Sequence, residues 1–193
     1  MKSLTGKLIA LAFIGSITFA SCGDGDGNAD GTDTMSTGEQ MSAAADTVQD
    51  AMNGDQDKRF VQDAIELNTK ELAWINEGIQ NGTDADVKKH AKHMLPDHEK
   101  MGTEMTAYAA KMSIEMPNVD VTNEVDNNEK KGRDWDKKWA DKMVDDHEKA
   151  INRFENASGT VKDPELKTMI DNTLPTLRSH LEMAKTLEAK FDK

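Results

Sequence analysis

The sequence predicts an all-α protein built around a ferritin-like four-helix bundle, and three observations lead to this prediction. From residue 58 onward, apolar residues recur at alternating spacings of three and four, the period of an amphipathic helix. Four such stretches are separated by helix-stop and helix-start signals. The longest separation, roughly residues 113–133, is rich in Asn and Asp and can run the full length of a bundle, as in ferritin-like folds with one long crossover.

Residues 1–21 are predicted to be a lipoprotein signal peptide. Lys2 and Lys7 precede an apolar run that is too short for a stable membrane-spanning helix, and small residues lead to Cys22. The stretch 19–22 resembles a bacterial lipobox, in which the cysteine is acylated and becomes the new N-terminus. Cys22 is therefore the predicted lipidation site and membrane contact, and the expected location is the bacterial envelope, as an outer-membrane lipoprotein facing the periplasm or the cell surface. An ordinary signal peptide with a chance cysteine is the alternative.

Residues 22–57 are predicted to be a flexible acidic tether. Residues 23–57 hold nine acidic side chains, six glycines and no Lys or Arg. Such a segment cannot bury enough apolar surface to offset its conformational entropy, and its charges repel one another. We expect at most a transient helical turn or two between Met41 and Met52, and a bundle domain over residues 58–193.

The first two predicted helices are expected to form a tight antiparallel hairpin. One stripe consists of Phe60, Ala64, Leu67, Glu71 and Trp74. The next consists of Val87, Ala91, Met94, His98, Met101, Met105, Tyr108 and Met112. Between them, residues 81–84 combine a glycine that ends a helix with a Thr or Asp that can cap the following one.

The third and fourth predicted helices repeat this arrangement. The third stripe consists of Ala140, Met143, His147, Ala150 and Phe154. The fourth consists of Leu166, Ile170, Thr173, Leu177, His180, Ala184, Leu187 and Phe191. Pro164 suits the first position of a helix, whereas Pro96 and Pro175 fall inside helical patterns and are expected to kink them or to shift their register locally.

Four ionisable residues interrupt the apolar stripes, one on each predicted helix: Glu71, His98, His147 and His180. If the crossover brings the start of the third helix back to the end of the bundle at which the first helix ends, all four residues lie roughly 15–21 Å from that end. They can therefore meet inside the bundle. A simple up-down-up-down arrangement would also leave them near mid-height, so their convergence does not decide the topology.

Two interpretations of these four residues remain open. Three imidazoles and one carboxylate suit zinc, iron, manganese or copper, and Asp97 and Asp146, each next to a histidine, could orient a ring across a helix interface. Alternatively, the same groups form a hydrogen-bonded polar layer that fixes helix register. A ferritin-type di-iron centre is not expected, because the Glu of its Glu-x-x-His motif is missing. The positions three residues before the histidines are occupied by Leu95, Val144 and Leu177.

Four local stretches resemble a known family. They are Phe60 to Glu71, Met94 to His98, Met143 to Ala150 and Thr173 to Leu181, in this order. Together they resemble the bacterial envelope family called domain of unknown function 4142, over about residues 57–190. The resemblance implies a ferritin-like helical bundle that is often exported, with no assigned activity.

The charge balance limits the function classes. With 36 acidic and 24 basic residues the formal net charge is −12, so nucleic acid is not an expected partner. No serine-hydrolase arrangement or phosphate-binding loop is present, and no protein partner can be named. We therefore expect a metal-binding module in an accessory or stress-related role. The alternatives are a non-catalytic structural or interaction module and, ranked lower, an oxidoreductase at a single metal ion.

Two weaker candidates lie on the second predicted helix. His90 and His93 could form a surface metal site, although a solvated charged face is the simpler interpretation. The methionines at positions 94, 101, 105 and 112 could offer thioethers to Cu(I), although flexible filling of the core is the preferred interpretation.

Overall fold

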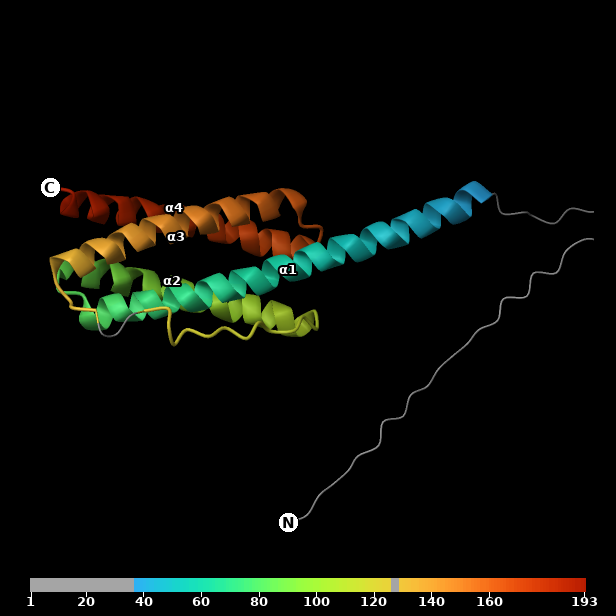
Figure 1. Cartoon of the computed structure of the whole chain (residues 1–193). Coiled ribbons are helices and arrows are strands. Elements are labelled where there is room, and N and C mark those ends of the chain that lie inside the picture. Colours follow the sequence, from blue (N-terminus) through green and yellow to red (C-terminus); the bar gives the residue numbers. More distant parts are fainter. Residues whose placement is uncertain (1–36, 126–128) are drawn as a thin grey trace, which may run out of the picture. The chain divides into compact units, whose positions relative to one another are not determined.

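Four α-helices make up the fold (Figure 1). The structure, a computed structural model, describes residues 37–125 and 129–193, with side chains from residue 54 onward. The helices are α1 (Thr37–Asn81), α2 (Ala85–Lys111), α3 (Arg133–Thr160) and α4 (Pro164–Phe191). Cys22, the predicted signal peptide and residues 22–36 of the predicted tether lie outside the described residues. Within the described part of the chain, no helix is long and apolar enough to cross a membrane.

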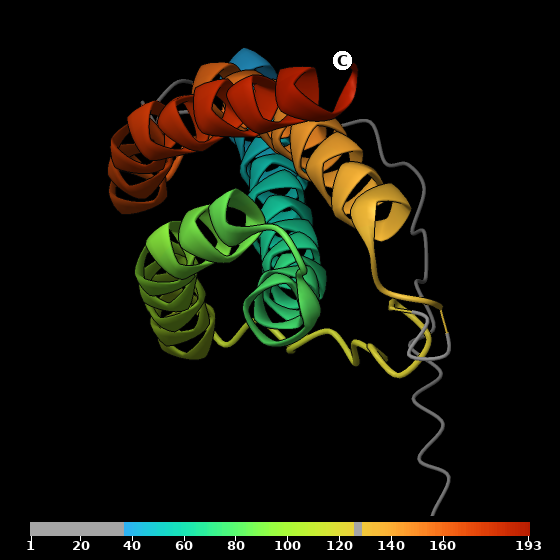
Figure 2. The same cartoon turned by 90° about the vertical axis from the view of Figure 1, so that its left-hand side faces the viewer.

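The chain folds into two helical hairpins that stack on each other. α1 and α2 run antiparallel, and the crossover of residues 112–132 then returns the chain to the end at which α2 began (Figure 1). As a result α3 runs parallel to α2, and α4 runs parallel to α1. In the end-on view, α1 lies on α3 and α2 lies on α4 (Figure 2). This arrangement confirms the predicted ferritin-like bundle with one long crossover.

An aspartate caps the second helix of each hairpin, and Asp84 is one of the capping residues that the sequence predicted. The Asp84 side chain accepts a hydrogen bond from the Asp86 amide at the start of α2, and the Asp163 side chain accepts one from the Leu166 amide at the start of α4. Pro164 occupies the first helical position, where its missing N–H is not needed. Further along, α2 and α4 continue through Pro96 and Pro175.

The structure differs from the sequence prediction at residues 37–57. The sequence predicts a flexible tether here, but α1 begins at Thr37 and continues without a break to Asn81. Its N-terminal part extends beyond the other three helices (Figure 1). Starting a helix costs free energy, whereas adding a residue to an existing helix costs little. A well-packed helix can therefore be extended through good helix formers such as the three alanines at 43–45.

Two buried aspartates connect the hairpins. Asp136 on α3 accepts hydrogen bonds from the amides of Thr83 (2.9 Å) and Asp84 (2.8 Å), in the α1–α2 loop. Asp57 on α1 accepts longer hydrogen bonds from the α3–α4 loop, 3.1 Å from the amide of Asp163. Each hairpin loop is therefore held by a carboxylate of the opposite hairpin.

A polar layer divides the apolar core into two clusters. One cluster surrounds Phe60, Phe154 and Ile170, towards the α3–α4 loop. The other surrounds Trp74 and Trp139, towards the α1–α2 loop. Between them lie five buried polar side chains, which are Asn68, Glu71, His98, His147 and His180. The bundle thus holds the ionisable residues at mid-height, with apolar packing above and below.

Candidate metal centre

Three histidines from three different helices converge in the polar layer. His98 on α2, His147 on α3 and His180 on α4 are 3%, 1% and 1% exposed, respectively. Their ring centroids lie 5.3–5.5 Å apart. One nitrogen from each ring lies within 4.8 Å of one from each of the others. We call these three residues the histidine triad.

Hydrogen bonds determine which nitrogen of each ring is available. His98 Nδ1 lies 3.0 Å from Asn68 Oδ1, and the same Asn68 donates from Nδ2 to the His98 carbonyl, which assigns its amide orientation. His147 Nδ1 lies 2.8 Å from the Met143 carbonyl, and His180 Nε2 lies 3.1 Å from the Asp97 carboxylate. All three partners are acceptors, so each of these ring nitrogens carries the proton.

The opposite nitrogens consequently carry lone pairs. They are His98 Nε2, His147 Nε2 and His180 Nδ1. All three are buried and have no hydrogen-bond partner among the described residues. Leaving a buried acceptor unpaired is unfavourable, and three such atoms in one layer are uncommon in a native core.

Burial keeps the triad neutral. Desolvation, together with the neighbouring rings of His147 and His180, holds the pKa of His98 well below its usual value. Desolvation lowers the pKa of His147 to about 4. It also lowers the pKa of His180, although the Asp97 carboxylate acts in the opposite direction. Neutral imidazole is the form that binds a metal ion, so at neutral pH no proton needs to leave.

Glu71 lies beside the triad and is not one of its convergent groups. Its Oε1 is 3.6 Å from His147 Nδ1, the nitrogen that faces the Met143 carbonyl. That oxygen has no hydrogen-bond partner among the described residues. Burial raises the pKa of Glu71 well above its usual value, and the nearby Asp146 carboxylate raises it further.

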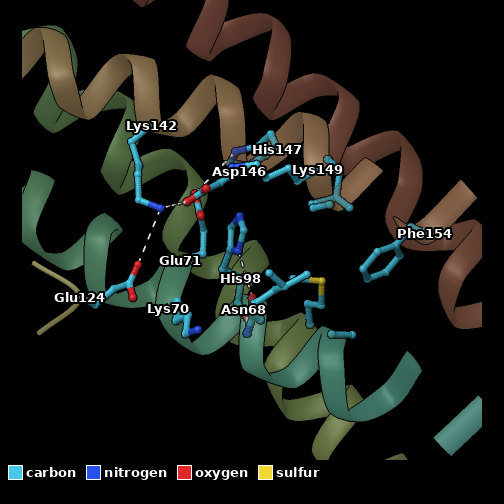
Figure 3. A pocket seen from close by; sticks show the side chains of 15 residues that line it. Asn68, Lys70, Glu71, His98, Glu124, Lys142, Asp146, His147, Lys149 and Phe154 are labelled. Carbon is cyan, nitrogen blue, oxygen red and sulfur yellow. Dashed lines mark hydrogen bonds and ion pairs between the residues drawn. The ribbon is translucent and has the colours of Figure 1, made fainter. Parts of the chain in front are cut away.

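The two aspartates next to histidines have different surroundings. Asp97 on α2 accepts from His180 on α4, which is a ring oriented across a helix interface. Asp146 instead pairs with Lys142 one helical turn earlier, at 2.6 Å, and lies beside Glu71 (Figure 3). The structure therefore places Asp97 behind a triad ring and Asp146 in the neighbouring carboxylate group.

Two cavities adjoin the triad. The first has a volume of about 80 Å³ and lies between α1 and α3, where Glu71, His98 and His147 line it together with more exposed charged residues (Figure 3). The second has a volume of about 70 Å³ and lies between α2 and α4, where Asp97, His98 and His180 line it. The triad thus has space on two sides.

Comparisons with known proteins give the family and support the fold. The sequence matches the family described as "Domain of unknown function (DUF4142)" over residues 40–187. The chain belongs to the DUF4142 family. No curated protein matches it.

Solved structures resemble this DUF4142 chain as well. One is described as "CopM in the Cu(II)-bound form", with a TM-score of 0.58 at 15% sequence identity, covering 69% of this chain and 97% of the other. A second, "CopM in the Cu(I)-bound form", has the same TM-score and identity and covers 70% of this chain and 96% of the other. At this identity the likeness establishes a shared helical-bundle fold.

Asn68 is the site residue of this DUF4142 chain that sequence reasoning missed. It is buried and makes two hydrogen bonds to His98. Gly102 leaves room for it, since a Cβ there would lie 2.7 Å from Asn68 Nδ2. The helical spacing of Asn68 from the buried residues Val61 and Ile65 was the available signal.

The weaker candidate metal ligands on α2 differ in their burial and in their position relative to the triad. His93 is exposed, and its ring lies edge-on to His180 with centroids 6.2 Å apart. Met94 and Met105 are buried core residues, whereas Met112 is exposed. Met101 is half-buried and lines both cavities. The methionines of this stripe therefore pack mainly in the core, as their helical spacing indicates.

Proposed function

We propose that this protein binds one transition-metal ion at the histidine triad of His98, His147 and His180. The observation that carries the proposal is the set of three buried lone-pair nitrogens without partners. A polar layer whose role was only to fix helix register would be expected to pair its inward atoms with one another. In this layer one nitrogen of each ring is paired and the other is not, and a cation between the rings would satisfy all three unpaired nitrogens.

The donor set suits copper, zinc or iron better than manganese. Neutral imidazoles suit all three of these metals, whereas manganese prefers oxygen ligands. Three protein ligands leave a further coordination position for water or another small molecule. The fold shared with CopM, whose solved structures are described as Cu(II)-bound and Cu(I)-bound, supports testing copper first. In this proposal Glu71 lies beside His147 and is not a ligand of the metal ion.

The acceptors behind the rings support the same proposal. Metal-binding histidines usually donate their other N–H to a carboxylate, a carbonyl or a similar group, which fixes the ring and increases its basicity. The triad has one of each kind: an amide oxygen from Asn68, a backbone carbonyl from Met143 and a carboxylate from Asp97. The placement at the envelope with Cys22 as the lipid anchor stays a prediction from the sequence.

Metal content after equilibration tests the proposal. The purified protein is stripped with a chelator, equilibrated separately with Cu(II) and Zn(II), desalted and measured by elemental analysis. We expect about one ion per chain for at least one metal, and loss of that ion in His98→Ala, His147→Ala and His180→Ala. We expect Asn68→Ala to weaken binding by about 10–100-fold, because it removes the acceptor that orients His98.

His93→Ala is the matched control. It removes a histidine from the same helix, next to His180, but one that is exposed and outside the triad. We expect it to keep the metal content of the wild type. Circular dichroism establishes that each variant remains helical. Equal metal content in the wild type and in folded triad variants would contradict the proposal and leave the polar layer as a structural feature.

A further inference from the structure

The cavity between α1 and α3 leads from charged, partly exposed residues to the triad. Its inner wall contains His98, His147 and the buried Glu71, and its outer wall contains Asp146, Glu124 and Lys142 (Figure 3). The Asp146 and Glu124 side chains are each 21% exposed. The cavity therefore holds two partly exposed carboxylates, from α3 and the crossover, and the buried carboxyl group of Glu71 on α1 beside His147.

Lys142 occupies the outer part of this carboxylate group. Its ammonium lies 2.6 Å from Asp146 Oδ2 and 3.7 Å from Glu124 Oε1. It also lies 5.5 Å from the centroid of the Trp74 ring, and Trp74 Nε1 donates to Glu124 Oε1 at 3.3 Å. A cation is thus already bound at the mouth of the cavity, supplied by the protein itself.

We propose that this cavity is the route by which the metal ion reaches the triad, and that the incoming ion displaces the Lys142 ammonium from Asp146 and Glu124. The inference rests on the proposed metal-binding function and adds the path and the residues that control it. Carboxylates in a narrow cleft concentrate cations and accelerate their association. Glu71 Oε1, which is buried and has no hydrogen-bond partner among the described residues, lies 3.6 Å from His147 Nδ1 and adds an oxygen beside the triad in the same cavity.

The second cavity is less suited to this role. Its carboxylate nearest to the triad, Asp97, already accepts the hydrogen bond that orients His180. An ion entering there would compete for that oxygen and disturb a ligand. Its other charged lining residues, Lys100 and Glu104, are exposed and lie 3.9 Å from each other. The α1–α3 cavity instead offers carboxylates that do not hold a triad ring by any hydrogen bond in the structure.

Association kinetics test the route. The metal-free full chain is mixed with Cu(II) in a stopped-flow instrument, and quenching of tryptophan emission is recorded. The part of the signal that His147→Ala lacks reports binding at the triad. We expect Lys142→Met to raise the association rate constant about tenfold or more, since it removes the competing cation and keeps an apolar stem against Trp74. We expect Glu124→Gln to lower it.

Lys149→Met is the matched control. Lys149 lines the same cavity and its loss changes the net charge equally, but its ion-pair partner is Asp145, which does not line the cavity. We expect a change of about twofold or less, the part due to net charge alone. Equal rates in Lys142→Met and Lys149→Met would overturn the route while leaving metal binding intact. Faster association in Lys100→Met alone would place the route between α2 and α4, and absence of the triad signal in the wild type would overturn both proposals.

Discussion

At the scale of single residues, the site depends on acceptors that fix the tautomer of each histidine. The three acceptors come from different sources: an amide on α1, the carbonyl one turn back on α3, and a carboxylate on α2. Each ring is held by a hydrogen bond at one nitrogen, so the orientation of its other nitrogen is fixed. A rigid, neutral donor set formed in advance needs little reorganisation to bind an ion.

Burial of the triad predicts that the metal-free protein loses stability on acidification. An unfolded histidine takes up a proton near pH 6.5, whereas folded His147 does so near pH 4. Between these values the unfolded state binds more protons, so the free energy of unfolding falls as the pH falls. At about 1.4 kcal/mol per pKa unit, His147 alone contributes about 3 kcal/mol at pH 7 that is lost by about pH 4. Urea unfolding from pH 4 to pH 7.5, in the presence of a chelator, measures this.

The titration of Glu71 changes the free energy of unfolding in the opposite direction with pH. Glu71 must therefore be replaced before the contribution of His147 is measured. Its raised pKa means that the folded state keeps a proton that the unfolded state releases, so its contribution falls as the pH rises above about 4.5. The measurement is therefore made in Glu71→Gln, with and without His147→Asn, whose side-chain amide can still donate to the Met143 carbonyl. The same pH slope with and without His147→Asn would contradict the prediction.

At the scale of helices, α1 and α3 approach closely where Gly78 meets Trp139. A Cβ at position 78 would lie 2.7 Å from the Trp139 indole, which is fully buried and donates to the Trp74 carbonyl at 2.8 Å. We expect Gly78→Ala to lower the free energy of unfolding by about 1–3 kcal/mol, because the ring cannot move without losing this hydrogen bond. Chemical denaturation measures the change.

Gly159 provides the matched comparison on α3. It is exposed, and a Cβ there would meet nothing within 4 Å. Alanine is favoured over glycine in helices, so Gly159→Ala is expected to raise the free energy of unfolding by about 0.5–1 kcal/mol. If both substitutions were stabilising, close packing of Gly78 on Trp139 could not be the reason that glycine suits position 78.

Helix positions were largely predictable from the sequence, with one exception. Residues such as Val87, Met143 and Leu177 lie on the buried faces that their spacing predicted. The start of α1 was missed, because composition describes an isolated segment and cannot account for a helix continued from a packed neighbour. Asn68 was missed for a related reason, since only its partner on α2 makes a buried amide favourable.

At the scale of the whole molecule, two carboxylates join the hairpins that carry the triad. Asp136 on α3 accepts from two amides and one hydroxyl of the α1–α2 loop. We expect Asp136→Asn to lower the free energy of unfolding by about 2–3 kcal/mol, because an amide cannot accept at both of its ends. Urea denaturation measures this change.

Asp134→Asn is the control for this substitution. It removes the same charge from the first turn of α3 at an exposed position. Only the interaction with the helix dipole is lost, so the expected change is at most about 1 kcal/mol. A similar loss in both variants would mean that the contact between the hairpins contributes little. Asp57→Asn is expected to fall between them, since its hydrogen bonds are 3.1–3.4 Å long.

Periodicity and loop signals were sufficient to predict the four helices, their buried faces, the two tight hairpins and the long crossover. They also identified one ionisable core residue on each helix. Helical spacing carries this information because burial acts on each helix face separately. The tertiary structure alone determined that three imidazoles converge, that Glu71 lies beside them, and which nitrogen of each ring is free. Those features depend on hydrogen-bond partners from other helices, and a sequence pattern does not specify how one helix is rotated against the next.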